Sequence, residues 1–312
     1  MSFTQDVLND FVNMALKVGS NDFLKLLEDT IRLLADENGL VGRLRVNGRL
    51  VSAPPTGEAI VVGDIHGDLQ SLRHILNDSG FMDRAREGEE TFLLFLGDYG
   101  DRGPYSPEVY YVILKLKMLF SDKVVLMRGN HEGPEDLLAY PHDLPYYLER
   151  KFGAEGQKVY HKLSELFSYL YTSVIINERY VFFHGGVPSK ASSIDDIAYA
   201  NEKHPRETHF EEILWSDPIE NLRGTYASPR GAGRLFGEDV TYKVLKMFNV
   251  KAIIRGHEPC ENGFKINHGG KILTLFSRKG EPYYNQHGAY LKLNLSEIVE
   301  NVQQLRQYIH IF

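Results

Sequence analysis

Five short apolar runs in this chain each lead into a glycine-containing turn that carries a carboxylate, an amide or an imidazole. The runs cover residues 59–62, 92–96, 124–127, 180–183 and 252–254. The polar residues that follow them are Asp64 with His66, then Asp98, Asn130, His184 and His257. Glycine lets the chain turn sharply and lets its backbone approach an ion or a phosphate closely. Chance could supply one or two such turns, but five of them indicate one shared site.

The donor types in these turns favour a site for two divalent cations. Mixed oxygen and imidazole donors suit Mn²⁺, Fe or Zn²⁺ better than Ca²⁺, which prefers oxygen alone. Two divalent ions bring about four positive charges, and Asp64 and Asp98 neutralise two of them. About two positive charges remain to meet a phosphoryl dianion and a hydroxide, which a pair of ions about 3.5–4 Å apart generates from a shared water. The set therefore predicts hydrolysis of a phosphate ester, with Mn²⁺ as the expected ion in vitro and Fe or Zn²⁺ as alternatives.

The elements that must position these residues alternate between strand-like and helix-like stretches. Helical spacing of apolar residues occurs over residues 106–120 and twice within residues 1–40. Alternating strands and helices are typical of an α/β core, in which ligands lie at the carboxyl ends of the strands. No proline- or glycine-rich linker divides the chain. We therefore expect residues 1–312 to form a single catalytic domain, with residues 1–40 packed on it as a helical segment.

Composition narrows the classes of protein further. The 312 residues carry a net charge of -7, which does not favour a nucleic-acid partner. No apolar run approaches the ~20 residues that span a bilayer, so no membrane partner is expected. The single cysteine, Cys260, excludes an intramolecular disulfide, and the N-terminus does not have the pattern of a signal peptide. We expect a soluble, cytoplasmic protein.

Three motifs, in this order along the chain, resemble the signature of the phosphoprotein phosphatase family of serine/threonine protein phosphatases, within the calcineurin-like metallophosphoesterases. The motifs are Gly63-Asp64-x-His66-Gly67, Gly97-Asp98-x-x-Asp101-Arg102-Gly103 and Gly129-Asn130-His131-Glu132. The resemblance extends from about Leu8 to Leu293 and includes residues 214–218, 228–231 and 275–277. It implies an α/β fold with a central sandwich of two mixed β-sheets flanked by helices, and a dimetal site at the carboxyl ends of the strands.

The resemblance also implies a role for each site residue. Asp64 and His66 would bind the first metal, Asp98 would bridge the two metals, and Asn130, His184 and His257 would bind the second. His131 would be the general acid that protonates the leaving alkoxide, and Asp101 would orient it. Arg102 and Arg230, together with Asn130, would bind the phosphoryl oxygens. The implied substrates are phosphoproteins, and the implied reaction is direct attack of a metal-bridging hydroxide on phosphoserine or phosphothreonine; no regulatory subunit is indicated.

Two other functions stay open at this point. A hydrolase of dinucleoside polyphosphates or of another small phosphoester shares the three leading motifs, but such relatives usually have leucine where this chain has Tyr99. A catalytically inactive scaffold that binds phosphoproteins is expected to lack a ligand or His131, and none is missing. Most of the remaining histidines, including His142, are expected to have no role at the site.

One loop departs from the family pattern. After Leu275-Phe276-Ser277 the familiar members continue Ala-Pro-Asn-Tyr-Cys, whereas this chain continues Arg278-Lys279-Gly280-Glu281-Pro282-Tyr283-Tyr284. The family loop carries an aromatic residue over the active site. Tyr283 and Tyr284 are the candidates to replace it.

Overall fold

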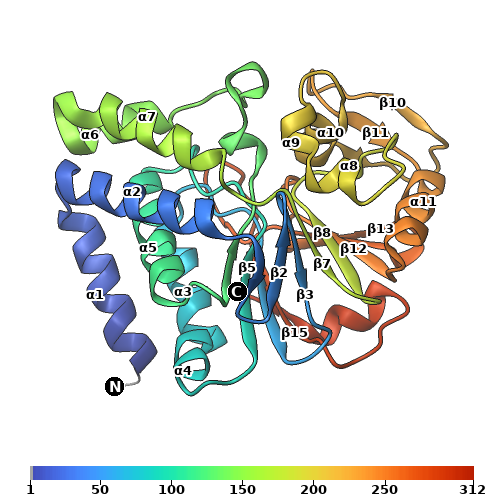
Figure 1. Ribbon diagram of the computed structural model, residues 1–312, viewed down its shortest axis with the longest axis horizontal. Coiled ribbons are helices and arrows are strands. Elements are labelled where there is room, and N and C mark those ends of the chain that lie inside the picture. The colour runs from blue at the N-terminus through green and yellow to red at the C-terminus, as the bar shows by residue number, and fades with distance from the viewer. Residues whose placement is uncertain (1–2) are drawn as a thin grey trace.

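Two large mixed β-sheets form the centre of the computed structural model, which describes residues 3–312 (Figure 1). The five-stranded sheet has the order β16-β15-β4-β5-β6. Its strands are β4 (Glu58–Val62), β5 (Thr91–Phe95), β6 (Val124–Leu126), β15 (Ala289–Asn294) and β16 (Ile309–Ile311). Because β4, β5 and β6 run parallel, their carboxyl ends lie at the same edge of this sheet.

The eight-stranded sheet has the order β1-β2-β3-β7-β8-β12-β14-β13. Its strands are β1 (Gly39–Val41), β2 (Leu44–Asn47), β3 (Leu50–Ala53), β7 (Ser173–Ile176), β8 (Tyr180–Phe183), β12 (Ala252–Arg255), β13 (Phe264–Asn267) and β14 (Ile272–Leu275). β12 runs parallel to both β8 and β14, so these three strands also end together. The five apolar runs seen in the sequence are β4, β5, β6, β8 and β12, drawn from both sheets.

The central strands of the eight-stranded sheet are buried on both faces, which explains why they read as continuous apolar runs. Along β8, Tyr180 and Phe182 belong to the core shared with the five-stranded sheet, whereas Val181 and Phe183 belong to a second core on the opposite face. This alternation follows from the two-residue period of a strand. The expected sandwich of two mixed sheets flanked by helices is confirmed.

Helices cover the outer faces of the two sheets. In Figure 1 the first group lies to the left of the sheets: α1 (Phe3–Lys17), α2 (Ser20–Asp36), α3 (Leu69–Ser79), α4 (Phe81–Arg86), α5 (Ser106–Leu119), α6 (Leu144–Phe152) and α7 (Gly156–Phe167). The second group lies to the right: α8 (Asp195–Ala198), α9 (Ala200–Lys203), α10 (His209–Trp215) and α11 (Glu238–Phe248). The helices expected within residues 1–40 and over residues 106–120 are thus α1, α2 and α5. Within residues 3–312, no helix is both long and apolar enough to cross a bilayer.

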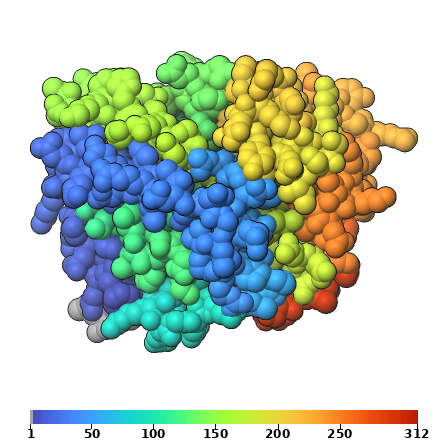
Figure 2. All heavy atoms as spheres, viewed as in Figure 1, coloured from blue at the N-terminus to red at the C-terminus, as the bar shows by residue number. Residues whose placement is uncertain are grey.

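The surface of the molecule shows how the N-terminal helices sit. In Figure 2 the blue N-terminal segment borders the yellow-green segment of α6 and α7, and α2 contacts both α7 and α5. α1 contacts α3, α4 and α5. The apolar faces of both helices belong to the larger core, through Leu8 and Val12 of α1 and Phe23 and Leu27 of α2.

A small third sheet was not expected from the sequence. It has the order β10-β11-β9 and consists of β9 (Asp217–Pro218), β10 (Thr225–Ala227) and β11 (Arg234–Phe236). Strands of two or three residues are too short for apolar alternation to reveal them. Short 3₁₀ helices complete the fold: η1 (Asn130–Glu132), η2 (Glu135–Leu137), η3 (Gly153–Glu155), η4 (His268–Gly270) and η5 (Val302–Tyr308).

Candidate metal centre

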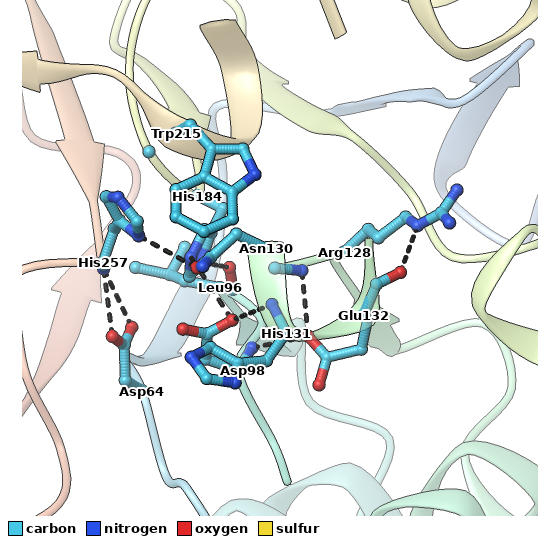
Figure 3. Close-up of polar contacts among 12 residues, drawn as sticks. Asp64, Leu96, Asp98, Arg128, Asn130, His131, Glu132, His184, Trp215 and His257 are labelled. Atoms are coloured by element: carbon cyan, nitrogen blue, oxygen red, sulfur yellow. Dashed lines mark hydrogen bonds and ion pairs between the residues drawn. The ribbon is translucent and has the colours of Figure 1, made fainter. Parts of the chain in front are cut away.

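The five polar turns converge where the two sheets meet. Asp64 follows β4 and forms an isolated parallel bridge with Phe276, which follows β14 of the other sheet. Figure 3 shows the side chains of Asp64, Asp98, His184 and His257 gathered around one centre. All six predicted metal ligands are buried. The sequence therefore identified residues that the fold brings together from strands of both sheets.

Asp98 lies between two groups of imidazoles. Its Oδ2 is 3.5 Å from Nε2 of His66, and its Oδ1 is 3.4 Å from Nε2 of His184. Asn130 Oδ1 is 2.9 Å from Nε2 of His184 and 2.9 Å from Nδ1 of His257. Two sets of possible ligand atoms therefore share Asp98, one with His66 and the other with His184 and His257, as the predicted bridging role requires.

The first set also contains His131, which the sequence assigned to catalysis rather than to metal binding. Asp64, the other predicted ligand of the first metal, has its Oδ2 3.9 Å from Nε2 of His66. The Asp64 carboxylate accepts the backbone N–H of His257 at 3.0 and 3.1 Å. Asp64 thus links the turn after β4 to the turn after β12, and its assignment to one metal stays a prediction.

Hydrogen bonds behind the imidazoles direct their lone pairs into the centre. Nδ1 of His66 donates to the carbonyl of Gly100 at 3.0 Å, and Nδ1 of His184 donates to the carbonyl of Leu96 at 2.9 Å. Such backing bonds are typical of metal-binding histidines, because they fix the ring and leave Nε2 for the ion. Nε2 of His257 is buried without a hydrogen-bond partner among residues 3–312. This nitrogen faces Oδ1 of Asp217 at 3.9 Å, whereas Nδ1 of the same ring faces Oδ1 of Asn130 at 2.9 Å and is therefore the atom that a cation in the centre would meet.

The pKa values of the centre show how its charges interact. Burial raises the pKa of Asp64 to about 7, and the negative charge of Asp98 adds to the effect. Burial also opposes ionisation of Asp98, but His184 and His131 outweigh it and hold the pKa of Asp98 well below its usual range. Burial lowers the pKa of His184, yet the carboxylate of Asp98 more than offsets this and raises it to about 9. Burial lowers the pKa values of His66 and His257, so it is a proton on His184 that offsets the buried carboxylates. The residues present fit divalent cations that would take the place of that proton.

The backbone is strained at the same positions. Among residues 3–312, ten non-glycine residues have a positive φ, and five of these are predicted site residues: His66, Asp98, Asp101, Arg102 and His257. The left-handed region is costly for L-residues and persists where the surrounding structure enforces it, often at functional sites. Strain therefore marks the same turns that the sequence singled out.

Two glycines allow the carboxylates to approach the turns. A Cβ on Gly129 would lie 2.1 Å from Oδ1 of Asp98, and a Cβ on Gly256 would lie 2.4 Å from Oδ1 of Asp64. Any side chain at these positions would displace a carboxylate from the centre. The glycine beside each polar residue is thus required by packing at these two turns.

His131 and Asp101 form the pair that the resemblance implied. Nδ1 of His131 is 2.6 Å from Oδ2 of Asp101, and both side chains are buried. The backbone N–H of His131 donates to Oδ1 of Asp98 at 3.0 Å, which fixes the chain beside the metal ligands. Burial lowers the pKa of His131, but the carboxylates of Asp98 and Asp101 outweigh it, so the net shift is upward.

The two predicted phosphate-binding arginines are anchored by different partners. Arg102 donates through Nη2 to the carbonyl of Tyr140 at 3.0 Å. Arg230 donates through Nε to Oδ2 of Asp217 at 2.6 Å, and its positive charge adds to the effect of burial in lowering the pKa of His257. Asp217 also accepts from the fully buried Arg255 at 3.0 Å. Arg230 is therefore held close to the predicted second metal through its carboxylate partner.

Glu132 has a part in the site that sequence reasoning did not assign. Its Oε2 accepts the backbone N–H groups of Asp98 and Gly129 at 2.8 and 3.0 Å, and its Oε1 accepts from the N–H of Tyr99 and the hydroxyl of Tyr110. One buried carboxylate thus ties the turn after β5 to the turn after β6. The motif that contains Glu132 gave the only sequence signal.

The divergent loop does bring an aromatic side chain to the centre. The Tyr283 ring lies 5.4 Å from the His66 ring and 5.0 Å from the Phe276 ring, whereas Tyr284 is 73% exposed. Arg278 donates to the carbonyls of His66 and Glu281 and lies 5.9 Å above the Tyr283 ring. Of the two candidates, Tyr283 is therefore the one placed beside the predicted first metal.

Comparison with known proteins agrees with this site. The model of the calcineurin-like phosphoesterase family matches residues 59–261, a range that contains all six predicted metal ligands. A probable serine/threonine-protein phosphatase of Encephalitozoon cuniculi is 34% identical over 270 residues, which cover 83% of this chain and 56% of that protein. A catalytic subunit of protein phosphatase 2A from Dictyostelium discoideum is 33% identical over 291 residues, covering 92% of this chain and 86% of the relative. The chain belongs to the calcineurin-like phosphoesterase family, and the predicted resemblance to serine/threonine protein phosphatases is confirmed.

Solved structures support the fold. A serine/threonine phosphatase from Saccharomyces cerevisiae superposes with a TM-score of 0.74 at 24% identity, covering 95% of this chain and 89% of that one. A cold-active protein tyrosine phosphatase superposes with a TM-score of 0.56 at 19% identity over 78% of this chain and 75% of its own. At these identities the likeness concerns the fold alone.

Proposed function

We propose that this protein is a metal-dependent serine/threonine protein phosphatase that hydrolyses phosphoserine and phosphothreonine in phosphoproteins. The observation that carries the proposal is the position of Asp98 between two imidazole groups, with the His131–Asp101 pair beside it. The two relatives described above are named as serine/threonine phosphatases or their catalytic subunits, although this chain spans only 56% of the length of one of them.

We assign Asp64, His66 and Asp98 to the first metal, and Asp98, Asn130, His184 and His257 to the second. Divalent ions at these positions would supply a Lewis acid for the phosphoryl oxygens and would acidify a water for the attack. Mn²⁺ is proposed for the enzyme in vitro, since the mixed donors accept it, and Fe or Zn²⁺ are the alternatives that the same donors accept.

The remaining groups act on the substrate itself. Arg102 is anchored by the carbonyl of Tyr140 and Arg230 by Asp217. We propose that each guanidinium group presents parallel N–H donors to the phosphoryl oxygens. Asn130 lies beside His184 and His257 and contributes its amide to the same pocket. Guanidinium and amide groups bind a phosphoryl group through hydrogen bonds, without proton transfer.

His131 is proposed to give its Nε2 proton to the leaving serine or threonine oxygen. Its Nδ1 is held by Asp101 at 2.6 Å, so the ring presents Nε2 to the pocket. The upward shift of its pKa favours the protonated imidazole, the form that a general acid needs. Burial opposes ionisation of Asp101, but hydrogen bonds from His131 and His142 outweigh it and hold its pKa well below the usual range.

The Tyr99 side chain lies in the larger core, so it gives little direct evidence about the substrate. Its ring packs against Phe95 and Tyr110, and its hydroxyl donates to the carbonyl of Met127 at 2.8 Å. Tyr99 therefore supports a protein substrate only as a marker of the family. The small-phosphoester hydrolase is kept as the alternative activity.

We further propose that residues 1–312 act as one catalytic domain, because α1 and α2 pack into the larger core. A cytoplasmic location is proposed from the acidic composition and from Cys260, a buried free thiol, which suits a reducing compartment. Neither a nucleic acid nor a membrane is proposed as a partner.

Turnover of a phosphoserine peptide and of diadenosine tetraphosphate by the Mn²⁺-loaded protein tests the proposal. We expect the peptide to be the better substrate, and a preference of about a hundredfold for the nucleotide would establish the alternative. If the protein failed to hydrolyse p-nitrophenyl phosphate as well, the inactive scaffold would be the better description. His131→Asn is expected to keep its metals and to lose ~10²–10⁴-fold in kcat on the peptide.

A further inference from the structure

The Asp101 carboxylate is held by one segment of chain, residues 140–144, as well as by His131. Its Oδ1 accepts the backbone N–H groups of Asp143 and Leu144 at 2.9 and 2.7 Å. Its Oδ2 lies 2.6 Å from Nδ1 of His131 and 2.8 Å from Nδ1 of His142. Three of the four hydrogen bonds to this buried carboxylate therefore come from residues 142–144.

The same segment also anchors the neighbouring arginine. The backbone N–H of Arg102 donates to Oδ1 of Asp143 at 2.9 Å, and its Nη2 donates to the carbonyl of Tyr140. Residues 140–144 thus connect the partner of the proposed general acid to a proposed phosphate-binding residue. The side chain of His142 reaches the Asp101 carboxylate from this segment through a hydrogen bond.

A helix on the far side orients the His142 ring. Nε2 of His142 lies 2.8 Å from the hydroxyl of Tyr160, which belongs to α7. In neutral imidazole one nitrogen accepts and the other donates. When the Tyr160 hydroxyl donates to Nε2, the N–H of His142 is on Nδ1 and faces Asp101.

We propose that His142 is a positioning residue for the general acid: its hydrogen bond to Oδ2 of Asp101 keeps that oxygen aligned on Nδ1 of His131. The inference rests on the proposed roles of His131 and Asp101. The two backbone donors fix Oδ1, while Oδ2 has two lone pairs, and His142 takes the one that His131 does not use. Without His142 that lone pair would need water or a turned carboxylate, and either would shift the ring of His131.

A purely structural role predicts something different. The His142 side chain is 14% exposed, and its ring lies 5.5 Å from the Tyr160 ring. Its role in this case would be to pack between residues 140–144 and α7. Phenylalanine would fill the same space without donating to Asp101. His142→Phe and His142→Asn therefore separate the two roles, since an asparagine amide nitrogen occupies about the position of Nδ1.

The experiment compares these variants on a phosphoserine peptide and on p-nitrophenyl phosphate, with metal content measured for each. His142→Phe is expected to lose ~10–100-fold in kcat on the peptide, the range for partners that orient a functional residue, with KM unchanged. The loss should be smaller on p-nitrophenyl phosphate, because p-nitrophenolate leaves without needing a proton. His142→Asn should recover most of the rate, and His161→Phe, on the exposed face of α7, should match the wild type.

A double-mutant cycle with His131→Asn gives the sharpest test. If His142 acts through the general acid, adding His142→Phe to His131→Asn should cause no further loss. An additive loss, an equal loss on both substrates or a loss of metal from His142→Phe would overturn the inference. Should His142→Phe fail to fold, His142→Gln takes its place: its amide reaches the position of Nε2, so equal rates for the Asn and Gln variants would also overturn it.

Failure of the proposed function is distinguishable from failure of this inference. Wild-type activity on the peptide in His131→Asn would overturn the acid role and the inference with it. A loss in His131→Asn together with full activity in His142→Phe would overturn the inference alone.

Discussion

Two buried polar clusters in this molecule differ in whether their charges and hydrogen bonds are balanced within the protein. In the first, Lys117 of α5 donates from Nζ to Oε1 of Glu37 at 2.6 Å and to the carbonyls of Ser121 and Val124 at 2.7 and 3.1 Å. The Tyr171 hydroxyl donates to the other oxygen of Glu37. The three ammonium protons and both carboxylate oxygens therefore have partners within the protein, and the charges of the pair cancel.

The candidate metal centre is equally buried, but its charges are not balanced by other protein groups. Asp64 and Asp98 bring two carboxylates together, and Nε2 of His184 and Nδ1 of His257 each face Oδ1 of Asn130 at 2.9 Å. The cluster of Lys117, Glu37 and Tyr171 is balanced within the protein, whereas the donors of the candidate metal centre are not, and they fit divalent cations. Buried charged groups that are not neutralised by other protein groups indicate a functional site. Buried charged groups that are fully paired within the protein indicate a structural role.

Removing a carboxylate from the metal centre should have the largest effect on activity and little on folding. Asp98→Asn removes the predicted bridging charge, so we expect the variant to bind less metal and to lose at least ~10²–10⁴-fold in kcat/KM on a phosphopeptide. Mn²⁺ at about 1,000 times its Kd should stabilise the wild type by ~4 kcal/mol and should not stabilise the variant. Thermal melts with and without Mn²⁺ measure this difference. A metal-free variant that melts far below the metal-free wild type would contradict the contrast between the clusters.

Removing a charge from the cluster of Lys117, Glu37 and Tyr171 should lower stability and leave activity unchanged. Lys117→Met leaves Glu37 buried without its cation, which is expected to cost ~3–5 kcal/mol of unfolding free energy in urea titrations. The kcat of the folded protein should be unchanged. The double variant Glu37→Met with Lys117→Met should regain most of the stability, since apolar replacement of a whole buried pair is often neutral. If the double variant were as unstable as the single one, charge balance would not be what stabilises this cluster.

The unbalanced centre should also release protons when it binds metal. With the pKa of His184 raised to about 9, its imidazole is protonated in the metal-free protein at neutral pH, and an ion must displace that proton. Affinity for Mn²⁺ should therefore rise about tenfold per pH unit, or ~100-fold from about pH 6.5 to 8.5, and level off above about 9. Calorimetry in buffers of different ionisation enthalpy measures the released proton. A Mn²⁺ affinity that stayed constant between about pH 6.5 and 8.5 would show that no such proton is displaced.

The metal centre was predictable from the sequence, whereas the groups that support it were not. Asp64, Asp98, Asn130, His184 and His257 each closely follow an apolar strand, so a local pattern reveals them even though the strands belong to two sheets. The arrangement of the sheets themselves came from the family resemblance, because spacing alone does not say which strands pair.

The supporting groups act across long stretches of sequence. Glu132 reaches the N–H groups of Asp98 and Tyr99, 34 and 33 residues earlier, and His142 reaches Asp101, 41 residues earlier. Neither contact leaves a periodic or local signal, which is why His142 was expected to have no role at the site. Only folding brings these partners together.

The cluster of Lys117, Glu37 and Tyr171 was not predicted from the sequence either, because its members are far apart along the chain. Tyr171→Phe tests how much the hydrogen bond from the Tyr171 hydroxyl contributes to the stability of this cluster. The change removes one hydrogen bond to a charged oxygen while Lys117 still pairs with Glu37, so we expect a loss of ~1.5 kcal/mol in unfolding free energy and no change in kcat. Tyr146→Phe, at a tyrosine that is 60% exposed, is the matched control and should be neutral. A loss as large as that of Lys117→Met would mean that the hydroxyl, rather than the ammonium, is what holds Glu37 in its buried position, and the comparison of the two clusters would then rest on hydrogen bonding instead of charge.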